Sequence, residues 1–299
     1  MDRAKIIGVL IAIAQLCACS RPGAERAIRV GSKNFTEQVV LGEIIAQHLE
    51  NRLQRTVDRR LNLGGTLLAH QALITGEIDL YPEYTGTALS AILKDSAKGR
   101  DPDAVLKVIR SEYRRRFQVQ WLDPLGIDNG FAMVVRGPEG RRLRLESLTD
   151  AARTNRDWTL GVGYEFEQRA DGLPALTSTY RLRFSSSPKS MDLGLLYQAL
   201  DQGKVDIVAA NATDGLLSKL DLKVLADDRH AFPAYQVAIA VRQHRLETIP
   251  GLQPALSELS GKFTNKKMQE LNYLVDGEHR PAAQVAAAFL KEAGLQRQR

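Results

Sequence analysis

The sequence predicts an α/β protein made of two lobes. Short apolar runs alternate with segments whose apolar residues recur at helical spacing, which indicates a parallel or mixed sheet with helices on its faces. The alternation occurs in two blocks of roughly 100 residues each, a common domain size. Two turns that lead into buried strands, near residues 127–131 and 229–235, are the predicted crossings between the lobes.

Two crossings make the first lobe discontinuous. The predicted boundaries place residues 28–128 and 232–299 in lobe 1 and residues 129–231 in lobe 2. The helical C-terminal segment then packs back onto lobe 1. A chain of 299 residues is long enough for this arrangement.

The first block begins the alternation. Its predicted elements are a strand at 28–32, a helix at 36–53, a strand at 57–65, a helix at 66–77 and a strand at 78–84. Thr36 is placed to cap the first helix, and Gly76 helps to end the second. Pro82 is expected to stop the third strand.

The rest of the chain continues the same rhythm. The predicted helices are at 101–117, with Pro102 in its first turn, and at 147–153 and 192–204. The predicted strands are at 131–135, 158–163, 205–215 and 234–242. The segment that follows the last of these strands, from residue 243 to the C-terminal region, is predicted to be helical.

Composition and charge restrict the class of protein. The chain is 44% hydrophobic and 25% charged, which is typical of a globular protein. Its formal charge is +6, but the basic residues are spread out. The runs near Arg59, Arg115 and Arg142 lack interleaved aromatic residues, so we interpret them as solvated surfaces and expect no nucleic-acid partner.

The N-terminus has the pattern of an export signal. Arg3 and Lys5 precede the apolar run Ile6–Leu16, which is too short to span a bilayer. "LCAC" then resembles a lipobox, in which Cys19 is acylated and begins the mature chain; cleavage nearby without lipid is the alternative. Residues 1–18 are thus predicted as a lipoprotein-type signal peptide, and residues 19–27 as a tether that holds the protein to a membrane outside the cytoplasm.

Motifs for catalysis are missing. Both cysteines lie in the N-terminal segment, which leaves no disulfide framework and no cysteine nucleophile in the body of the protein. The five histidines form no H-E-x-x-H pair, and neither G-x-S-x-G nor a phosphate-binding G-x-x-x-x-G-K-[ST] occurs. "GVG" at 161–163 lacks the third glycine of a dinucleotide site. We therefore expect no enzyme activity, no cofactor and no metal.

Five motifs carry a family resemblance. "GSKNFTEQVVLGEII", "LNLGGT", "DLYPEYTGTAL", "RADGLP" and "MQELNYLVDGE" occur in order between Ile28 and the C-terminus. Together they closely resemble the osmoprotectant branch of ABC-importer substrate-binding proteins, which bind glycine betaine, carnitine and choline. The resemblance implies the type II periplasmic binding protein fold, with two α/β lobes that close on a ligand in the cleft. It also implies an extracytoplasmic monomer that passes a small quaternary ammonium ligand to ABC permease and ATPase subunits.

The chemistry of such a ligand defines what a site must offer. A trimethylammonium group carries positive charge but no N–H donor, so the faces of aromatic rings bind it best, at roughly 0.5–2 kcal/mol per contact. The carboxylate of a betaine requires Lys, Arg or the N–H groups of a helix N-terminus. Rings are therefore expected at one end of the site and donors at the other.

The resemblance also implies which residues form the site. The rings of an aromatic cage are Tyr84, Phe131 and Tyr235, and the polar positions are Lys33, Thr87, Asn129, Glu165, Arg169 and Asn211. Asn211 stands where relatives usually have a further cage tyrosine, and Phe131 where tyrosine is frequent. Simpler interpretations remain open for several residues: Tyr84 and Phe131 as packing residues, Arg169 as an ion-pair residue and Lys33 as a surface residue.

The two differences from the relatives, at Phe131 and Asn211, leave the identity of the ligand undecided. Losing a ring at Asn211 weakens the expectation of tight glycine betaine binding. An amide offers both a donor and an acceptor, so a ligand with an extra polar group fits this position. The alternatives are a binding protein for another ligand and a sensory protein on the same fold.

Overall fold

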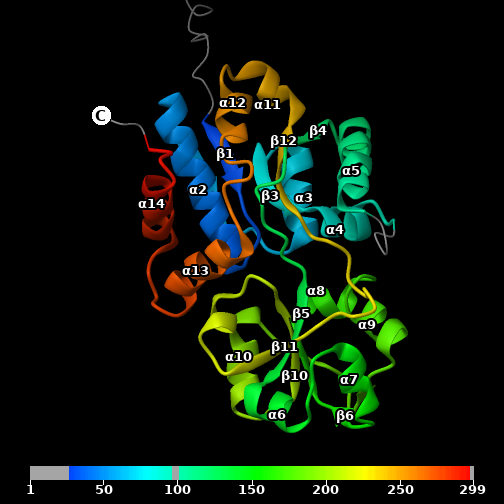
Figure 1. The fold of residues 1–299 in the computed structure, drawn as a ribbon. Helices are drawn as coiled ribbons and strands as arrows, with labels where there is room; N and C mark the ends of the chain where they lie inside the picture. The colour runs from blue at the N-terminus through cyan, green and yellow to red at the C-terminus, as the bar shows by residue number, and fades with distance from the viewer. Residues whose placement is uncertain (1–26, 96–100, 297–299) are drawn as a thin grey trace, which may run out of the picture.

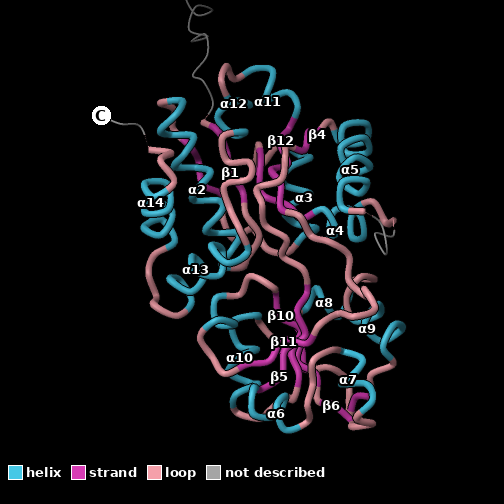
Figure 2. Tube along the Cα trace, viewed as in Figure 1, coloured by secondary structure: helices cyan, strands magenta, loops and turns pink. Residues whose placement is uncertain are grey.

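The computed structural model describes residues 27–95 and 101–296. Within them the chain forms two five-stranded sheets, each flanked by helices and placed one above the other (Figures 1 and 2). The predicted signal peptide, most of the tether and Cys19 lie outside the described residues. No helix in the described part is both long and apolar enough to cross a membrane.

The first sheet has the order β2-β1-β3-β12-β4. Its strands are β1 (Ile28–Gly31), β2 (Val57–Arg60), β3 (Leu80–Tyr84), β4 (Val119–Trp121) and β12 (Val237–Arg242). β1 is parallel to β2 and β3, whereas β12 enters antiparallel between β3 and β4. A strand from late in the chain therefore completes a sheet that the first 121 residues began.

Helices cover both faces of this sheet. They are α2 (Thr36–Leu53), α3 (Thr66–Thr75), α4 (Thr85–Thr87) with the π-helical η1 (Ala88–Ile92), α5 (Pro102–Phe117), α11 (Gln243–Thr248), α12 (Leu252–Ser257), α13 (Asn265–Asp276) and α14 (Ala282–Glu292). Ile44 of α2 shares one buried core with Val285 and Leu290 of α14. The C-terminal helices therefore pack against the N-terminal part of the chain, as Figure 1 shows.

The second sheet has the order β11-β5-β10-β7-β9. Its strands are β5 (Phe131–Arg136), β7 (Leu160–Val162), β9 (Lys189–Ser190), β10 (Ile207–Asn211) and β11 (Leu222–Leu225), with β6 (Asp157–Trp158) and β8 (Arg183–Phe184) as a separate pair. The accompanying helices are α6 (Gly137–Arg142), α7 (Leu148–Arg153), α8 (Tyr164–Gln168), α9 (Leu173–Tyr180), α10 (Leu193–Asp201) and the 3-10 helix η2 (Gly215–Ser218).

The predicted α/β alternation is confirmed by these elements. The chain passes between the sheets before β5 and again before β12. The division into 28–128 with 232–299, and 129–231, stays a prediction at the level of individual residues. The predicted helices at 36–53 and 101–117 correspond to α2 and α5, and Gly76 ends α3 in the left-handed conformation.

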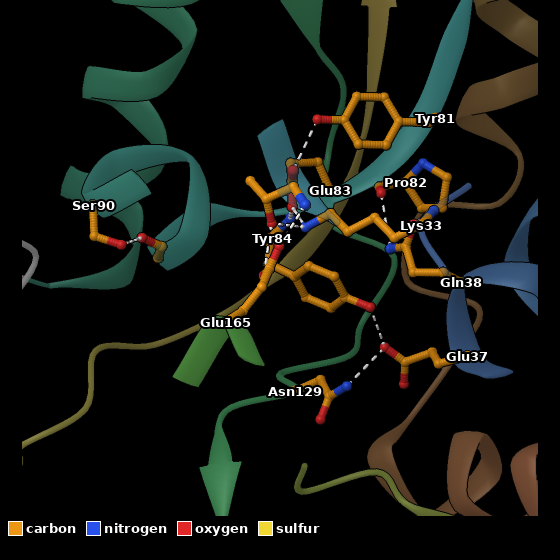
Figure 3. A network of polar contacts seen from close by, with 12 residues as sticks. Lys33, Glu37, Gln38, Tyr81, Pro82, Glu83, Tyr84, Ser90, Asn129 and Glu165 are labelled. Atoms are coloured by element: carbon orange, nitrogen blue, oxygen red, sulfur yellow. Dashed lines mark hydrogen bonds and ion pairs between the residues drawn. The ribbon is translucent and has the colours of Figure 1, made fainter. Parts of the chain in front are cut away.

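The prediction that Pro82 stops the third strand is wrong. β3 continues through Pro82 to Tyr84, and Pro82 lies opposite Ile239 of β12. The Pro82 carbonyl accepts a hydrogen bond from Gln38 Nε2 at 2.9 Å, so this peptide edge faces a side chain of α2 (Figure 3). A proline fits a strand where no ladder bond requires its N–H.

The prediction that Thr36 caps α2 is also wrong. The cap position is occupied by Phe35, which makes no side-chain capping bond. Thr36 is the first helical residue, and its hydroxyl donates to Asp276 Oδ1 of α13 at 2.6 Å. The hydrogen bond of Thr36 to the Asp276 carboxylate replaces the local capping bond that the sequence predicted.

Candidate functional site

A cavity lies between the two sheets. Its volume is about 800 Å³, which is within the range of small-molecule sites. All nine side chains proposed from the sequence line it: Lys33, Tyr84, Thr87, Asn129, Phe131, Glu165, Arg169, Asn211 and Tyr235. They lie at or just beyond the ends of β1, β3, β5 and β10, at the end of α4, in α8 and at its C-terminal cap, and in the two crossings.

Lys33 is buried in an ion pair beside the cavity. Its Nζ lies 2.5 Å from Glu83 Oε1 and 3.0 Å from Thr66 Oγ1 (Figure 3). The other oxygen of Glu83 accepts the Tyr81 hydroxyl at 2.8 Å. The interpretation of Lys33 as a plain surface lysine is therefore wrong, because only 2% of the residue is exposed.

Cationic groups of the protein lie against all three proposed rings. Lys33 Nζ is 4.9 Å from the centroid of the Tyr84 ring. The Arg169 guanidinium carbon is 5.4 Å from the centroid of Phe131 and 5.8 Å from that of Tyr235. The rings therefore stabilise the buried cations of Lys33 and Arg169 through cation–π contacts.

Arg169 is held by a buried carboxylate. Its Nε and Nη2 donate to the two oxygens of Asp171 at 2.9 and 2.6 Å. Asp171 also accepts the hydroxyls of Ser90 at 2.7 Å and Tyr235 at 2.8 Å. Burial opposes ionisation of Asp171, but the bonds and charge of Arg169 prevail and lower its pKa.

Glu165 joins the two sheets on the same side of the cavity. Its Oε1 accepts the backbone N–H of Thr66 at 2.5 Å, and its Oε2 accepts the Thr66 hydroxyl at 3.0 Å. Gly65 leaves room for this contact, because a Cβ there would lie 2.5 Å from Glu165 Oε1. Together with the contact of Ser90 to Asp171, this bond connects loops of the first sheet to loops of the second.

Glu37 is a site residue that the sequence reasoning missed. It is 2% exposed and lines the cavity. Its carboxylate accepts the Tyr84 hydroxyl at 2.7 Å and the Asn129 amide at 2.9 Å (Figure 3). It also accepts the Thr213 hydroxyl. The motif "GSKNFTEQ" contained Glu37, but no local pattern assigns it these three partners.

Burial raises the pKa of Glu37, although its three hydrogen bonds oppose the rise. The folded state therefore retains a proton that the unfolded state releases, so the free energy of unfolding falls as pH rises above the ordinary pKa of 4.5. Glu37→Gln keeps an acceptor for Tyr84 and does not ionise. We expect its stability relative to the wild type to increase over this pH range, by at most about 1.4 kcal/mol per pH unit.

Urea unfolding of both proteins at several pH values between 4.5 and 7.5 measures this difference. A constant offset between the two curves would contradict a raised pKa at Glu37.

Further aromatic side chains line the cavity besides the three proposed rings. They are Phe35, Tyr164, Phe166 and Tyr197. Phe35 stacks near Tyr84 with ring centroids 6.1 Å apart, and Phe166 meets Phe131 edge to face at 4.8 Å. Phe35 and Phe166 each lie two or fewer residues from a proposed site residue, which is the signal that sequence reasoning passed over.

Asn211 lies directly opposite Phe131 in the antiparallel pair of β10 and β5. Its side-chain Nδ2 donates to Asp214 Oδ1 at 3.3 Å. Asp214 also accepts the Tyr197 hydroxyl at 2.8 Å. Where the resemblance led us to expect a ring, the structure has an amide bonded to a carboxylate.

Gly86 allows Tyr235 to approach the start of α4. A Cβ at Gly86 would lie 2.7 Å from the Tyr235 ring and 2.7 Å from the Ala234 carbonyl oxygen. We expect Gly86→Ala to displace Tyr235 and to lower the free energy of unfolding by roughly 1–3 kcal/mol, the usual cost of overpacking. Chemical denaturation measures the loss; Gly194→Ala, where a Cβ meets no atom within 4 Å, is the matched control. Equal stability of the two variants would contradict this packing argument.

Known proteins resemble this chain over nearly its whole length. Residues 26–292 match the family model described as the substrate-binding domain of an ABC-type glycine betaine transport system. A carnitine transport binding protein of Listeria monocytogenes is 30% identical over 283 residues, which cover 93% of this chain and 91% of the relative. An ergothioneine transport permease/ergothioneine binding protein of Helicobacter pylori is 32% identical over 272 residues, covering 91% of this chain and 48% of the relative.

Solved structures show a similarity to the same class of transport proteins. A crystal structure described as a glycine betaine/carnitine/choline ABC transporter superposes with a TM-score of 0.75 at 28% identity, covering 90% of this chain and 99% of the other. The expected type II periplasmic binding protein fold is confirmed, and these relatives are transport proteins, not enzymes. The chain belongs to the family of extracytoplasmic substrate-binding proteins of ABC-type glycine betaine and carnitine transport systems.

Proposed function

We propose that this protein captures a quaternary ammonium compound in the cavity between its sheets. The observation that carries the proposal is the placement of the Tyr84, Phe131 and Tyr235 rings around one cavity. A trimethylammonium group binds best to aromatic rings, and we assign Tyr84, Phe131 and Tyr235 as its cage, with the ligand on the ring surface that Lys33 and Arg169 leave free.

The polar residues serve the other end of the ligand. Lys33 and Arg169, each already paired with a carboxylate of the protein, offer their remaining N–H groups to a ligand carboxylate, and Thr87 at the end of α4 supplies a hydroxyl. Asn129 and Glu165 position neighbouring groups through their bonds to Glu37 and Thr66. The names of relatives suggest carnitine and ergothioneine as further ligands to test.

Delivery to an ABC permease is part of the same proposal. One relative joins a permease and a binding protein in a single chain, which supports a permease as the partner. We propose that Cys19 carries a lipid that anchors the mature monomer near this permease, outside the cytoplasm.

Asn211 favours a ligand other than glycine betaine as a second candidate. Its amide lies beside Phe131 on the neighbouring strand and donates to Asp214, and both Asn211 and Asp214 line the cavity. A ligand with an additional polar group can bond there, because an amide offers both a donor and an acceptor. A sensory role would retain this binding without transport.

A thermal-shift panel tests the binding proposal. We expect at least one of glycine betaine, choline, carnitine, proline betaine and ergothioneine to raise the melting temperature. Binding to the folded state alone stabilises by about 2.7 kcal/mol when the ligand is at 100 times its Kd. For a protein of this size that corresponds to a rise of roughly 5–10 °C. No shift with any of them at millimolar concentration would contradict the proposal.

A further inference from the structure

One end of the cavity carries carboxylates that the proposed function does not use. Glu37, Asp214 and Asp276 line it, together with the amides of Asn211 and Asn272. We call these five residues the acidic corner. They come from α2, from the end of β10 with its following turn, and from α13, so elements flanking both sheets contribute.

Hydrogen bonds hold the carboxylates of the acidic corner in place. Asp214 accepts the Tyr197 hydroxyl at 2.8 Å and the backbone N–H of Asn211 at 3.0 Å. Asp276 accepts the Thr36 hydroxyl at 2.6 Å. These donors are neutral, so they orient the carboxylates without balancing their charge.

In the described part of the chain, no lysine or arginine pairs with these carboxylates, and His279 is a basic residue whose charge acts on Asp276. Among residues 27–95 and 101–296, none of the three carboxylates of the acidic corner forms an ion pair. Lys33 and Arg169, the two basic residues that line the cavity, are instead paired with Glu83 and Asp171.

Negative charge on Glu37 and Asp214 is energetically unfavourable in this part of the cavity. Burial raises the pKa of Glu37 and of Asp214. The neighbouring carboxylates add to the rise, Asp214 for Glu37 and Asp276 for Asp214. A positive group placed between them would relieve this repulsion.

Asn272 is the independent observation that points to a ligand. It is 2% exposed, and its Nδ2 donates to the Thr213 carbonyl at 2.9 Å. Its Oδ1 is buried without a hydrogen-bond partner in the described part of the chain, and the residue lines the cavity. A buried acceptor without a donor is unfavourable, so an N–H or O–H group of a ligand that bonds to this oxygen would stabilise the site.

The acidic corner therefore offers mainly acceptors: carboxylate oxygens and an amide oxygen. In the described residues, no group of three or more His, Cys, Asp or Glu side chains is arranged to hold a metal ion. A trimethylammonium group has charge but no N–H, whereas a primary ammonium group has charge and three donors.

We propose that the acidic corner binds a cationic group that carries N–H bonds, and that the preferred ligand joins such a group to its quaternary ammonium group. This inference rests on the proposed function, which assigns the quaternary group to the rings. The two places are adjacent: Asn211 lies opposite Phe131, and Glu37 accepts the Tyr84 hydroxyl. Directly opposite residues have Cβ atoms about 4.5–5.5 Å apart, which suits a linker of two or three carbons.

Titration calorimetry of the purified chain with matched ligands tests this inference. The probes are (2-aminoethyl)trimethylammonium and (3-aminopropyl)trimethylammonium, each compared with the bis-quaternary analogue in which the amine is fully methylated. At a pH where the amine is protonated, charge and linker are the same within each pair, and the head groups differ in N–H donors and in size; the corner variants separate these two differences. We expect the better amine to bind about tenfold tighter than its analogue, or more, because hydrogen bonds to charged groups are strong.

Variants of the acidic corner test whether its carboxylates cause the preference for the amine over the methylated analogue. Asp276→Asn and Asp214→Asn should each reduce the preference for the amine to about threefold or less. Asp276 bonds only to Thr36 at the edge of the cavity, so Asp276→Asn keeps the test valid if Asp214→Asn does not fold. The control is Asp201→Asn, an exposed acidic residue at the end of α10 outside the cavity.

The outcomes separate the two proposals. Choline or glycine betaine binding together with equal affinity for amine and analogue would overturn the acidic corner and leave the proposed function standing. An amine preference that persists in both corner variants would overturn the acidic corner as its source. No binding of any quaternary ligand, with or without an amine, would overturn both proposals.

Discussion

Lys33→Met is expected to lower the free energy of unfolding by about 3–5 kcal/mol, the usual cost of removing one partner of a buried ion pair. Glu83 is 0% exposed and would lose its cation, which leaves the Tyr81 hydroxyl and the backbone N–H of Tyr84 as its hydrogen-bond donors. Equilibrium unfolding in urea measures the loss.

The double variant Lys33→Met/Glu83→Gln is the control for Lys33→Met. Replacing both partners of a buried pair by neutral groups of similar size is often nearly neutral, so we expect the double variant to recover most of the stability. A loss below about 1 kcal/mol for Lys33→Met alone would mean that water reaches Glu83. It would also restore the interpretation of Lys33 as a surface residue.

Tyr235→Ala is expected to weaken binding of a quaternary ammonium ligand by about 100-fold, which is roughly 2.7 kcal/mol. Two effects combine. The ring contributes a cation–π contact of roughly 0.5–2 kcal/mol. Its hydroxyl also donates to Asp171, which holds Arg169, and a hydrogen bond to a charged group contributes about 1.5–3 kcal/mol.

Two further variants separate the contributions of the ring and the hydroxyl. Tyr235→Phe keeps the ring and should retain more affinity than Tyr235→Ala. Tyr84→Ala should also lose most of the binding, because it removes a second ring and the hydroxyl bonded to Glu37. Calorimetry with the ligand that gives the largest thermal shift measures all three. Unchanged affinity in both alanine variants would contradict the aromatic cage.

Local sequence patterns predicted correctly those elements whose ends are set by residues close in the sequence. The apolar spacing over 36–53 gives α2, and Gly76 ends α3 because only a residue that tolerates a positive φ suits that position. The errors at Thr36 and Pro82 have one cause. In both, a partner far along the chain decided the outcome: Asp276 for the Thr36 hydroxyl and Gln38 for the Pro82 carbonyl.

The sequence predicted the identities of the site residues better than their contacts. All nine proposed residues line the cavity, because motifs at the ends of strands mark loops that open into the cleft. Glu37 and Asp171, which hold Tyr84 and Arg169 in place, were missed. A carboxylate in a motif does not show which donors will surround it after folding.

By itself the sequence determined the order of strands and helices, the two α/β blocks and the family, since each is recorded in residue spacing or in contiguous motifs. Only the tertiary structure decided that Lys33 pairs with Glu83, that Arg169 lies against two rings, and that Asp214, Asn272 and Asp276 meet at one end of the cavity. The physical reason is distance along the chain. The hydroxyl of Thr36 and the carboxylate of Asp276 are 240 residues apart in sequence, and only the packing of α13 beside α2 brings them within hydrogen-bond distance.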